Sequence, residues 1–247
     1  MQQLILHVPH SSINIPLREG YIIDERMLNS ELLKLTDWYT DDLFYSESDI
    51  MVRAEFSRLF CDPERFSDDE QEVMAQFGMG VLYEKTDGGE IMRKVSVELR
   101  ERILNEYYSI HHSKLNNAVN SQLRSFGSAL ILDCHSFPDI PLLRDLNQDA
   151  SRPDFNIGTD AFHTPQKLID MSLTFFIDKG YTIEDNAPYK GSIVPMEHYI
   201  KNQQVHSIML EINRKLYLNE GSNEKSSGYG EIKSVTQEYM AELKKHF

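Results

Sequence analysis

The sequence predicts an α/β fold, with a mostly parallel or mixed central sheet flanked by helices, in a single domain of residues 1–247. Short apolar runs typical of buried strands alternate along the chain with segments that carry helical periodicity. Strands joined through helices are normally parallel, because the crossover packs back onto the sheet in a right-handed sense. A chain of 247 residues that are 40% hydrophobic can bury a full core as one domain.

Five short segments are expected to form the strands. Each is dominated by branched or aromatic apolar residues, which suit the pleated surface of a sheet. These segments are residues 4–8, 49–56, 129–134, 181–184 and 206–212.

The clearest helix is expected to begin after Ser96 and to run to about Ser125. Its apolar residues are spaced to form one stripe along the helix. A serine side chain is preferred at a helix N-cap, and Gly127 suits the left-handed residue that follows a helix C-terminus.

Two further helices are expected in the second half of the chain. One begins at Thr164 and Pro165, a cap followed by proline at the first helical position, and stops at Gly180. The other covers residues 231–245. Long connections in a compact domain are often functional loops. Two of this kind are residues 66–89 and 219–230.

The charge balance excludes one large class of partner. The chain has 25 basic and 39 acidic residues and a formal net charge of -14, so it lacks the broad positive surface that duplex nucleic acid requires. A small substrate, including an anion bound by a local positive pocket, fits this composition. No nucleic-acid partner is expected.

The sequence also predicts a cytoplasmic protein with no membrane partner. It has no run of about eighteen apolar residues, and its first residues, MQQLILHVPH, do not resemble a signal peptide. The two cysteines, Cys61 and Cys134, do not form a disulfide framework, and Cys134 is expected to be a small buried hydrophobic residue within a strand.

Two histidines follow predicted strands at the point where the chain leaves the sheet. His10 lies in VPHSS and His135 in LDCHS. Ligands of open α/β sheets bind outside the carboxyl ends of the strands, so this pair predicts a shared metal or substrate site. His7, within its strand, is expected to be a hydrogen-bonded core residue. For either strand-end histidine alone, a polar loop residue is the simpler interpretation.

A zinc hydrolase usually supplies three protein ligands and leaves one position for water. The third ligand is expected to be Asp37 or Asp41, which are four residues apart and would share one face of a helix; Asp37 is the first choice. A solvated acidic helix face explains the same spacing. The sequence does not distinguish one zinc ion from iron or manganese.

Glu211 lies in the apolar strand sequence HSIMLEIN. A carboxylate is costly there unless it is paired or faces a site, and partial burial raises its pKa toward that of a general base. The alternative is a buried salt bridge with Arg214.

Three cations are candidates for binding an anionic substrate. Arg58 and Arg65 occur in SRLFCDPER, and guanidinium groups bind carboxylates with two hydrogen bonds. Lys190 has a glycine beside it that would allow close approach of a ligand. Ordinary ion pairs of the arginines with Asp62 or Glu64, and a simple loop lysine, are the alternatives.

These residues, taken in order, resemble the N-formylglutamate amidohydrolase family, which is related to the zinc carboxypeptidases. The matching phrases are HVPHSSINIP, TDWYTDDLF, SRLFCDPER, YYSIHHSKL, LDCHSFP, FNIGTD, NAPYKGSIVP and LEINRKLYLNE. The resemblance implies a zinc-carboxypeptidase-like fold. It also implies zinc-dependent hydrolysis of the amide of a small anionic N-formyl or N-acyl amino acid such as N-formyl-L-glutamate.

The resemblance also assigns roles to individual residues. His10 and His135 would bind the metal, and Glu211 would be the general base. Arg58 would polarise the scissile carbonyl, and Arg65 would hold the substrate carboxylate. Lys190 would add positive charge at the same place.

Two positions depart from the expected pattern. The carboxypeptidase glutamate ligand would fall at Ile13, so the third ligand must come from elsewhere. Glu64 stands where the family usually has asparagine, and a carboxylate beside the substrate-binding Arg65 would disfavour a dianion. The alternatives are therefore an amidohydrolase or carboxypeptidase-like enzyme acting on another N-acyl amino acid or small peptide, or a non-catalytic binding protein for a small acid.

Overall fold

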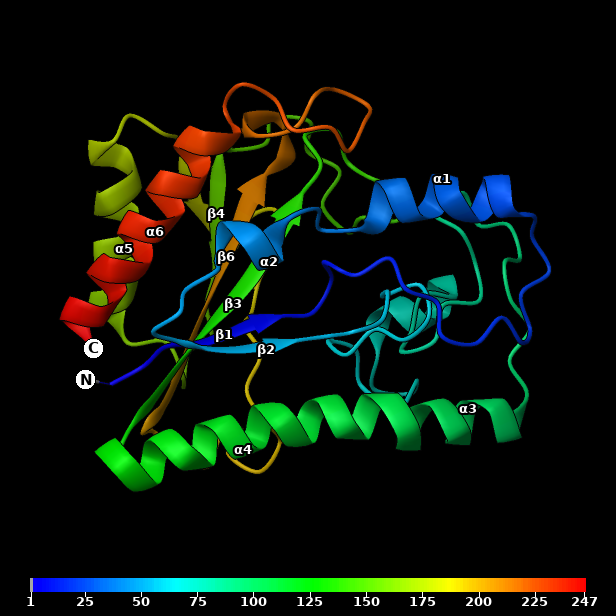
Figure 1. Cartoon of the computed structure of the whole chain (residues 1–247), viewed down its shortest axis with the longest axis horizontal. Helices are drawn as coiled ribbons and strands as arrows, with labels where there is room; N and C mark the ends of the chain where they lie inside the picture. The colour runs from blue at the N-terminus through cyan, green and yellow to red at the C-terminus, as the bar shows by residue number, and fades with distance from the viewer. Residues whose placement is uncertain (1) are drawn as a thin grey trace.

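A six-stranded mixed sheet forms the centre of the computed structural model, which describes residues 2–247. The order across the sheet is β2-β1-β3-β6-β4-β5. Strands β1, β2, β3 and β6 are parallel, whereas β4 runs antiparallel to β6 and pairs in parallel with β5 (Figure 1). The predicted fold class is confirmed. The strands are β1 (Ile5–Val8), β2 (Ile50–Arg53), β3 (Ala129–Phe137), β4 (Phe155–Gly158), β5 (Ile183–Asp185) and β6 (Val205–Asn213).

All five predicted strands are present, but β4 was missed by the sequence prediction. Its four residues include Asn156 and Gly158, which have low strand propensity. The Asn156 side chain is satisfied by neighbouring backbone: its Nδ2 donates to the carbonyl of Tyr189 and its Oδ1 accepts from the Ala187 N–H. These tertiary hydrogen bonds allow a polar residue to occupy a fully buried strand.

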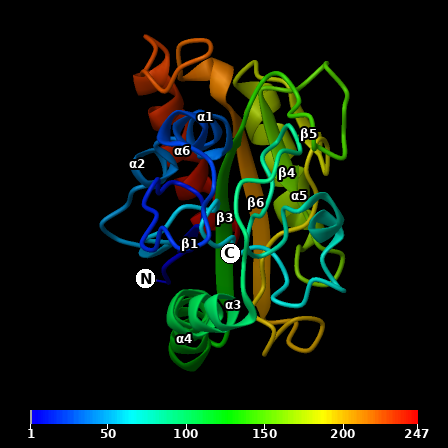
Figure 2. The ribbon, with the colours of Figure 1, turned by 90° about the vertical axis from the view of Figure 1, so that its right-hand side faces the viewer.

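Helices cover both faces of the sheet (Figures 1 and 2). On one face, α2, α5 and α6 share a buried apolar cluster with Leu4, Leu6 and Val8 of the β1 segment. On the other face, α4 packs against Ile5 and its neighbours. The helices are α1 (Glu25–Leu35), α2 (Thr40–Leu43), α3 (Val97–Ile103), α4 (Ser109–Phe126), α5 (Gln166–Asp178) and α6 (Tyr229–His246).

The long helix expected after Ser96 is confirmed and contains one irregular turn. The Ser96 hydroxyl accepts from the Leu99 N–H, and Gly127 follows α4 with φ 81°. Between α3 and α4 the chain forms a π-helical turn, Leu104–Tyr108. Such turns are often found at functional sites, and here Tyr108 faces the cavity described below.

The prediction for the start of α5 is wrong in one detail. Pro165 is the N-cap residue, and Thr164 does not cap the helix. The Thr164 hydroxyl instead accepts from the Asp160 N–H and donates to the carbonyl of Ser207. The end at Gly180 is confirmed by its φ of 85°. The C-terminal helix α6 begins two residues earlier than expected.

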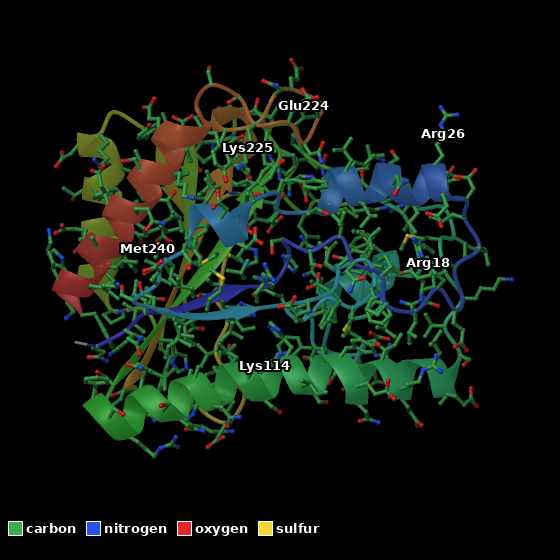
Figure 3. All side chains as sticks on the ribbon, in the orientation of Figure 1. Arg18, Arg26, Lys114, Glu224, Lys225 and Met240 are labelled. Carbon is green, nitrogen blue, oxygen red and sulfur yellow. The ribbon has the colours of Figure 1, made fainter. Side chains whose placement is uncertain are left out.

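A second packed region extends from the carboxyl ends of the parallel strands. It contains α1, the 3₁₀ turn Val73–Phe77 and the loops around them, with its own buried residues such as Leu32, Leu59 and Met92. Charged side chains such as Arg26 and Glu224 project outward from the framework (Figure 3). None of the helices in residues 2–247 combines the length and apolar character that crossing a membrane requires.

Candidate active site

A cavity of about 430 Å³ opens at the carboxyl ends of β1, β3 and β6. This is where ligands of open α/β sheets are expected to bind. All seven residues proposed from the sequence line it. They are His10, Asp37, Arg58, Arg65, His135, Lys190 and Glu211.

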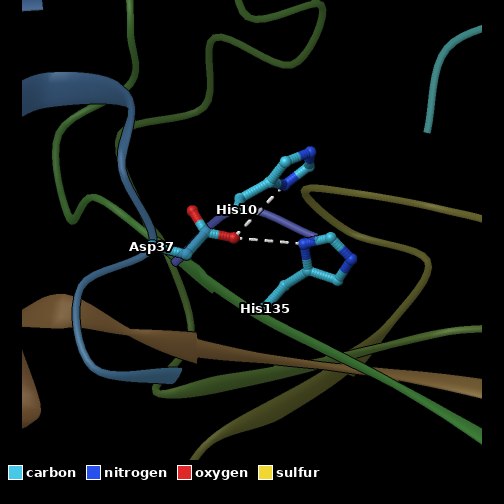
Figure 4. A group of neighbouring side chains, drawn as sticks. All are labelled: His10, Asp37 and His135. Carbon is cyan, nitrogen blue, oxygen red and sulfur yellow. Dashed lines mark hydrogen bonds and ion pairs between the residues drawn. The ribbon is translucent and has the colours of Figure 1, made fainter. Parts of the chain in front are cut away.

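His10, Asp37 and His135 bring their side chains together in this cavity (Figure 4). The Asp37 Oδ2 atom lies 3.1 Å from the His135 Nδ1 atom and 3.5 Å from the His10 Nδ1 atom. All three side chains are buried. Among residues 2–247, the His10 Nδ1 atom has no hydrogen-bond partner. Two imidazole nitrogens and one carboxylate oxygen form a donor set that suits a divalent metal ion.

The far side of each of these side chains is held by another polar group. The His10 Nε2 atom lies 2.8 Å from Asp62 Oδ1, and the His135 Nε2 atom lies 3.1 Å from Asp133 Oδ1. Carboxylates behind metal-binding histidines fix the tautomer and orientation of the ring. Here both rings turn Nδ1 toward Asp37, so the residues present fit a metal ion.

Asp37 reaches this position from a loop, and the predicted shared helix face with Asp41 is wrong. Helix α1 ends at Leu35 and α2 begins at Thr40, so Asp37 lies between them. Its backbone N–H donates to the carbonyl of His10 at 3.0 Å, which ties the two loops together. Asp41 pairs instead with Arg53 at 2.8 Å. The geometry therefore favours Asp37 as the third ligand.

Arg214 fixes the second oxygen of Asp37. Its Nη2 atom donates to Asp37 Oδ1 at 2.8 Å, and its guanidinium also donates to the Ser136 carbonyl. Burial opposes ionisation of Asp37, but the nearby His10 imidazole, the hydrogen bond with His135 and the Arg214 charge hold the pKa of the carboxyl well below its ordinary value. Asp37 is therefore an anion ready to bind a cation.

Glu211 lies beside this group without a hydrogen bond on one of its oxygens. The side chain is 7% exposed, and its Oε2 atom has no partner among residues 2–247. Burial raises the pKa of Glu211 to about 8, while the His135 charge lowers it and the Asp37 charge raises it. Arg214 is engaged with Asp37 rather than with Glu211, so the salt-bridge alternative is not formed.

The buried carboxylate of Asp62 holds both arginines near the cavity. Arg58 Nη2 donates to Asp62 Oδ2 at 3.0 Å, and Arg65 Nε lies 3.6 Å from the same oxygen. The Tyr83 hydroxyl also donates to Asp62. The ordinary ion pair expected as an alternative for the arginines therefore exists. It leaves both side chains lining the cavity, together with the exposed Lys190 at its edge.

Glu64 does not lie against Arg65 as the sequence suggested. Its carboxylate oxygens lie 3.1 Å from His135 Nε2 and 3.5 Å from His7 Nδ1, and no ion pair with Arg65 forms within 4.0 Å. The Glu64 carboxylate therefore opposes binding of a dianion at Arg65 less than its neighbouring place in the sequence implied.

Asp133 and Tyr108 contribute to the site and were missed by the sequence prediction, whereas His112, on the long helix, was expected as a residue that could help line it. Asp133 is a carboxylate inside an apolar strand. The argument that identified Glu211, that a buried carboxylate is costly unless it is paired or faces a site, therefore applied to Asp133 as well. The contact of Asp62 with His10 had no such signal, because His10 lies in a distant segment of the chain. Tyr108 donates to the Arg65 carbonyl at 2.9 Å, and His112 Nε2 lies 2.8 Å from the Pro63 carbonyl. Both hold the loop that carries Arg65.

Comparison with known proteins identifies the family of this site. The family model described as N-formylglutamate amidohydrolase matches residues 2–218. This chain belongs to the N-formylglutamate amidohydrolase family. Members of the family are amidohydrolases, so the chain is an enzyme of the hydrolase class.

Two relatives support the family assignment over most of the chain. The N-formylglutamate deformylase of Pseudomonas aeruginosa is 27% identical over 229 residues, which cover 88% of this chain and 82% of the relative. The crystal structure of N-formylglutamate amidohydrolase from Ralstonia eutropha superposes with a TM-score of 0.84 at 25% identity, covering 99% of this chain and 94% of the other.

A third structure shares the fold of this amidohydrolase at lower identity. It is a gene product of Agrobacterium tumefaciens with a TM-score of 0.66 and 17% identity, covering 98% of this chain and 92% of the other. The likeness shows that the same architecture accommodates a very different sequence.

Proposed function

We propose that this chain is a metal-dependent deformylase that hydrolyses the amide bond of N-formyl-L-glutamate, giving formate and glutamate. The observation that supports this most directly is the position of Glu211, whose unpaired Oε2 lies in the cavity beside His10, Asp37 and His135. The names of two relatives supply the substrate.

His10, Asp37 and His135 would hold one zinc ion. Their two nitrogens and one oxygen leave a coordination position open, as catalytic zinc sites require. A zinc ion held there would lower the pKa of a water molecule and polarise the amide carbonyl. Asp62, Asp133 and Arg214 keep the three ligand side chains oriented.

Glu211 would move the proton. As a carboxylate it accepts a proton from the attacking water, and as a carboxylic acid it delivers that proton to the leaving nitrogen. The water oxygen forms the new bond to the formyl carbon, and the C–N bond breaks to release the amine. A pKa raised by burial suits both steps, because the group must gain and lose the proton near neutral pH.

Two arginines would recognise the two ends of the substrate. Arg58 would donate hydrogen bonds to the carbonyl oxygen as negative charge develops on it. Arg65, with Lys190 nearby, would bind a substrate carboxylate and hold the amide in place for attack.

Formate release from N-formyl-L-glutamate by zinc-loaded protein tests the proposal. Release that disappears on chelation and returns with zinc is the expected result. The same assay with N-acetyl-L-glutamate and N-formyl-L-leucine separates a formyl-specific, glutamate-specific enzyme from a broader N-acyl amidohydrolase. Absence of hydrolysis with all three, together with tight binding of N-formyl-L-glutamate, would instead favour the non-catalytic binding protein.

A further inference from the structure

A second group of metal-binding side chains lies on the other edge of the His135 ring. His7, Glu64 and Asp133 form this group, and the Nε2 atom of His135 lies 3.1 Å from both carboxylates, whereas the first group uses the Nδ1 atom of that histidine. The imidazole of His135 therefore stands between the two groups.

These four side chains close into a ring, to which Glu64 contributes both of its carboxylate oxygens. Asp133 Oδ1 lies 2.7 Å from His7 Nδ1 and 3.1 Å from His135 Nε2. Glu64 completes the ring, with Oε1 3.5 Å from His7 Nδ1 and Oε2 3.1 Å from His135 Nε2. Ligands bound tetrahedrally at about 2.0–2.1 Å are roughly 3.3 Å apart, so the ring has the size of a metal cage.

The available protons do not satisfy this group by hydrogen bonding. The His7 Nδ1 and His135 Nε2 atoms both hydrogen-bond Asp133 Oδ1, and the His135 Nδ1 atom hydrogen-bonds Asp37, so none of these three hydrogen bonds reaches Glu64. The Glu64 carboxylate is left without a hydrogen-bond donor among residues 2–247, and its Oε1 atom is buried. A buried, unpaired carboxylate atom is costly, and a cation would compensate it.

The surroundings meet the other needs of a metal site. His7 Nε2 lies 2.9 Å from His111 Nε2, which fixes the ring of His7 from behind. The Asp133 Oδ2 atom accepts from the Ile193 N–H at 3.1 Å. An ion can enter from the cavity, because Glu64 is 20% exposed there and Asp133 also lines it.

We propose that His7, Glu64, Asp133 and His135 form a second binding site for a divalent cation, with the His135 ring shared between the two sites. When both sites are filled, both nitrogens of His135 bind metal, so the ring is an imidazolate and its N–H proton is released to solvent. Two nitrogen and two oxygen donors suit zinc, cobalt or manganese. The site is separate from the proposed single-zinc function, which does not require it. It shares with that function the His135 ring and Asp133, which orients that ring.

Metal stoichiometry tests the second site without an activity assay. Chelated protein is titrated with Zn²⁺, and metal retained after gel filtration is counted per chain. The wild type should retain two equivalents, and Glu64→Gln, which keeps the side-chain shape, should retain one. The affinity for the second equivalent should fall by more than about 100-fold, because loss of an outer-shell partner alone costs about 10–100-fold.

Two further variants assign each equivalent to its site. Asp37→Asn should lose the first equivalent and keep the second. Asp145→Asn removes a cavity carboxylate that belongs to neither group and should keep both. Circular dichroism and the unfolding midpoint establish that each variant folds, so that a loss of metal binding is not caused by unfolding.

The possible outcomes separate the two metal proposals. One equivalent in wild type that persists in Glu64→Gln and disappears in Asp37→Asn would overturn the second site and leave the first. One equivalent that disappears in Glu64→Gln and persists in Asp37→Asn would support the second site and overturn the first. Two equivalents unaffected by Glu64→Gln would also overturn the second site.

Discussion

His135 and Glu211 are register partners on the adjacent parallel strands β3 and β6. Directly opposed residues of neighbouring strands point to the same face of a sheet, so the proposed ligand and the proposed base are held side by side by backbone hydrogen bonds. On its other side Glu211 pairs with Asn156 of β4. The proposed base is therefore positioned by three strands rather than by a mobile loop.

Replacing Glu211 with glutamine should abolish most turnover while leaving the metal bound. The amide has nearly the same shape but cannot accept the proton of the attacking water, so kcat for formate release should fall by about 10²–10⁴-fold. Retained zinc, and an unfolding midpoint of the metal-free protein that is unchanged at about pH 5, serve as controls. Full activity in this variant would rule out Glu211 as the base.

The same substitution should change the pH dependence of stability. Burial raises the pKa of Glu211 from 4.5 to about 8 in the folded protein, so the folded state keeps a proton that the unfolded chain loses in this interval. The free energy of unfolding contributed by this group is therefore greatest below pH 4.5 and declines as the pH rises to about 8.

Urea unfolding of metal-free protein measures this effect. Glu211→Gln should be more stable than wild type at about pH 8.5, by on the order of a few kcal/mol, because each pKa unit corresponds to about 1.4 kcal/mol. The difference should largely vanish at about pH 5, where both side chains are neutral. An equal difference at the two pH values would mean that Glu211 does not titrate between them.

The sequence predicted which residues line the site better than it predicted the contacts between them. Strand-end position predicted the cavity-lining placement of His10 and His135, and burial in an apolar strand predicted that of Glu211. The helix periodicity used for Asp37 was wrong, because a loop separates α1 from α2. The ion pairs of Asp62 with Arg58 and Arg65 are local and were expected as alternatives, whereas its contact with His10 depends on tertiary folding and leaves no local pattern in the sequence.

Arg65→Lys should mainly raise KM for N-formyl-L-glutamate. Lysine keeps the charge but loses the paired hydrogen bonds of a guanidinium, and hydrogen bonds to charged groups contribute about 1.5–3 kcal/mol, or roughly 10–100-fold in binding. Lys190→Gln is the comparison, because Lys190 is exposed and its effect should be less than about fivefold. A fall in kcat alone for Arg65→Lys would contradict substrate binding by this residue.

Tyr108→Phe should weaken substrate binding through Arg65 rather than through a contact with the substrate. The hydroxyl donates to the Arg65 carbonyl, so its loss frees the loop that places the guanidinium. Removing one such hydrogen bond costs about 0.5–1.5 kcal/mol, and KM should rise by roughly 2–10-fold with little change in kcat. Tyr45→Phe, at an exposed tyrosine, is the control. Identical kinetics in the two variants would contradict the positioning role.

Metal binding should stabilise the folded chain through both proposed centres. A ligand that binds only the folded state adds about 4 kcal/mol at 1,000 times its Kd, which corresponds to a rise in Tm of roughly 10 °C for a chain of this size. Zinc should therefore raise the Tm of chelated wild type, and Asp37→Asn or Glu64→Gln should each retain only part of the rise. Asparagine at position 37 keeps an oxygen for Arg214, so the metal-free variant should still fold. The double variant should show no rise, and a rise as large as that of wild type would mean that zinc binds elsewhere on the chain.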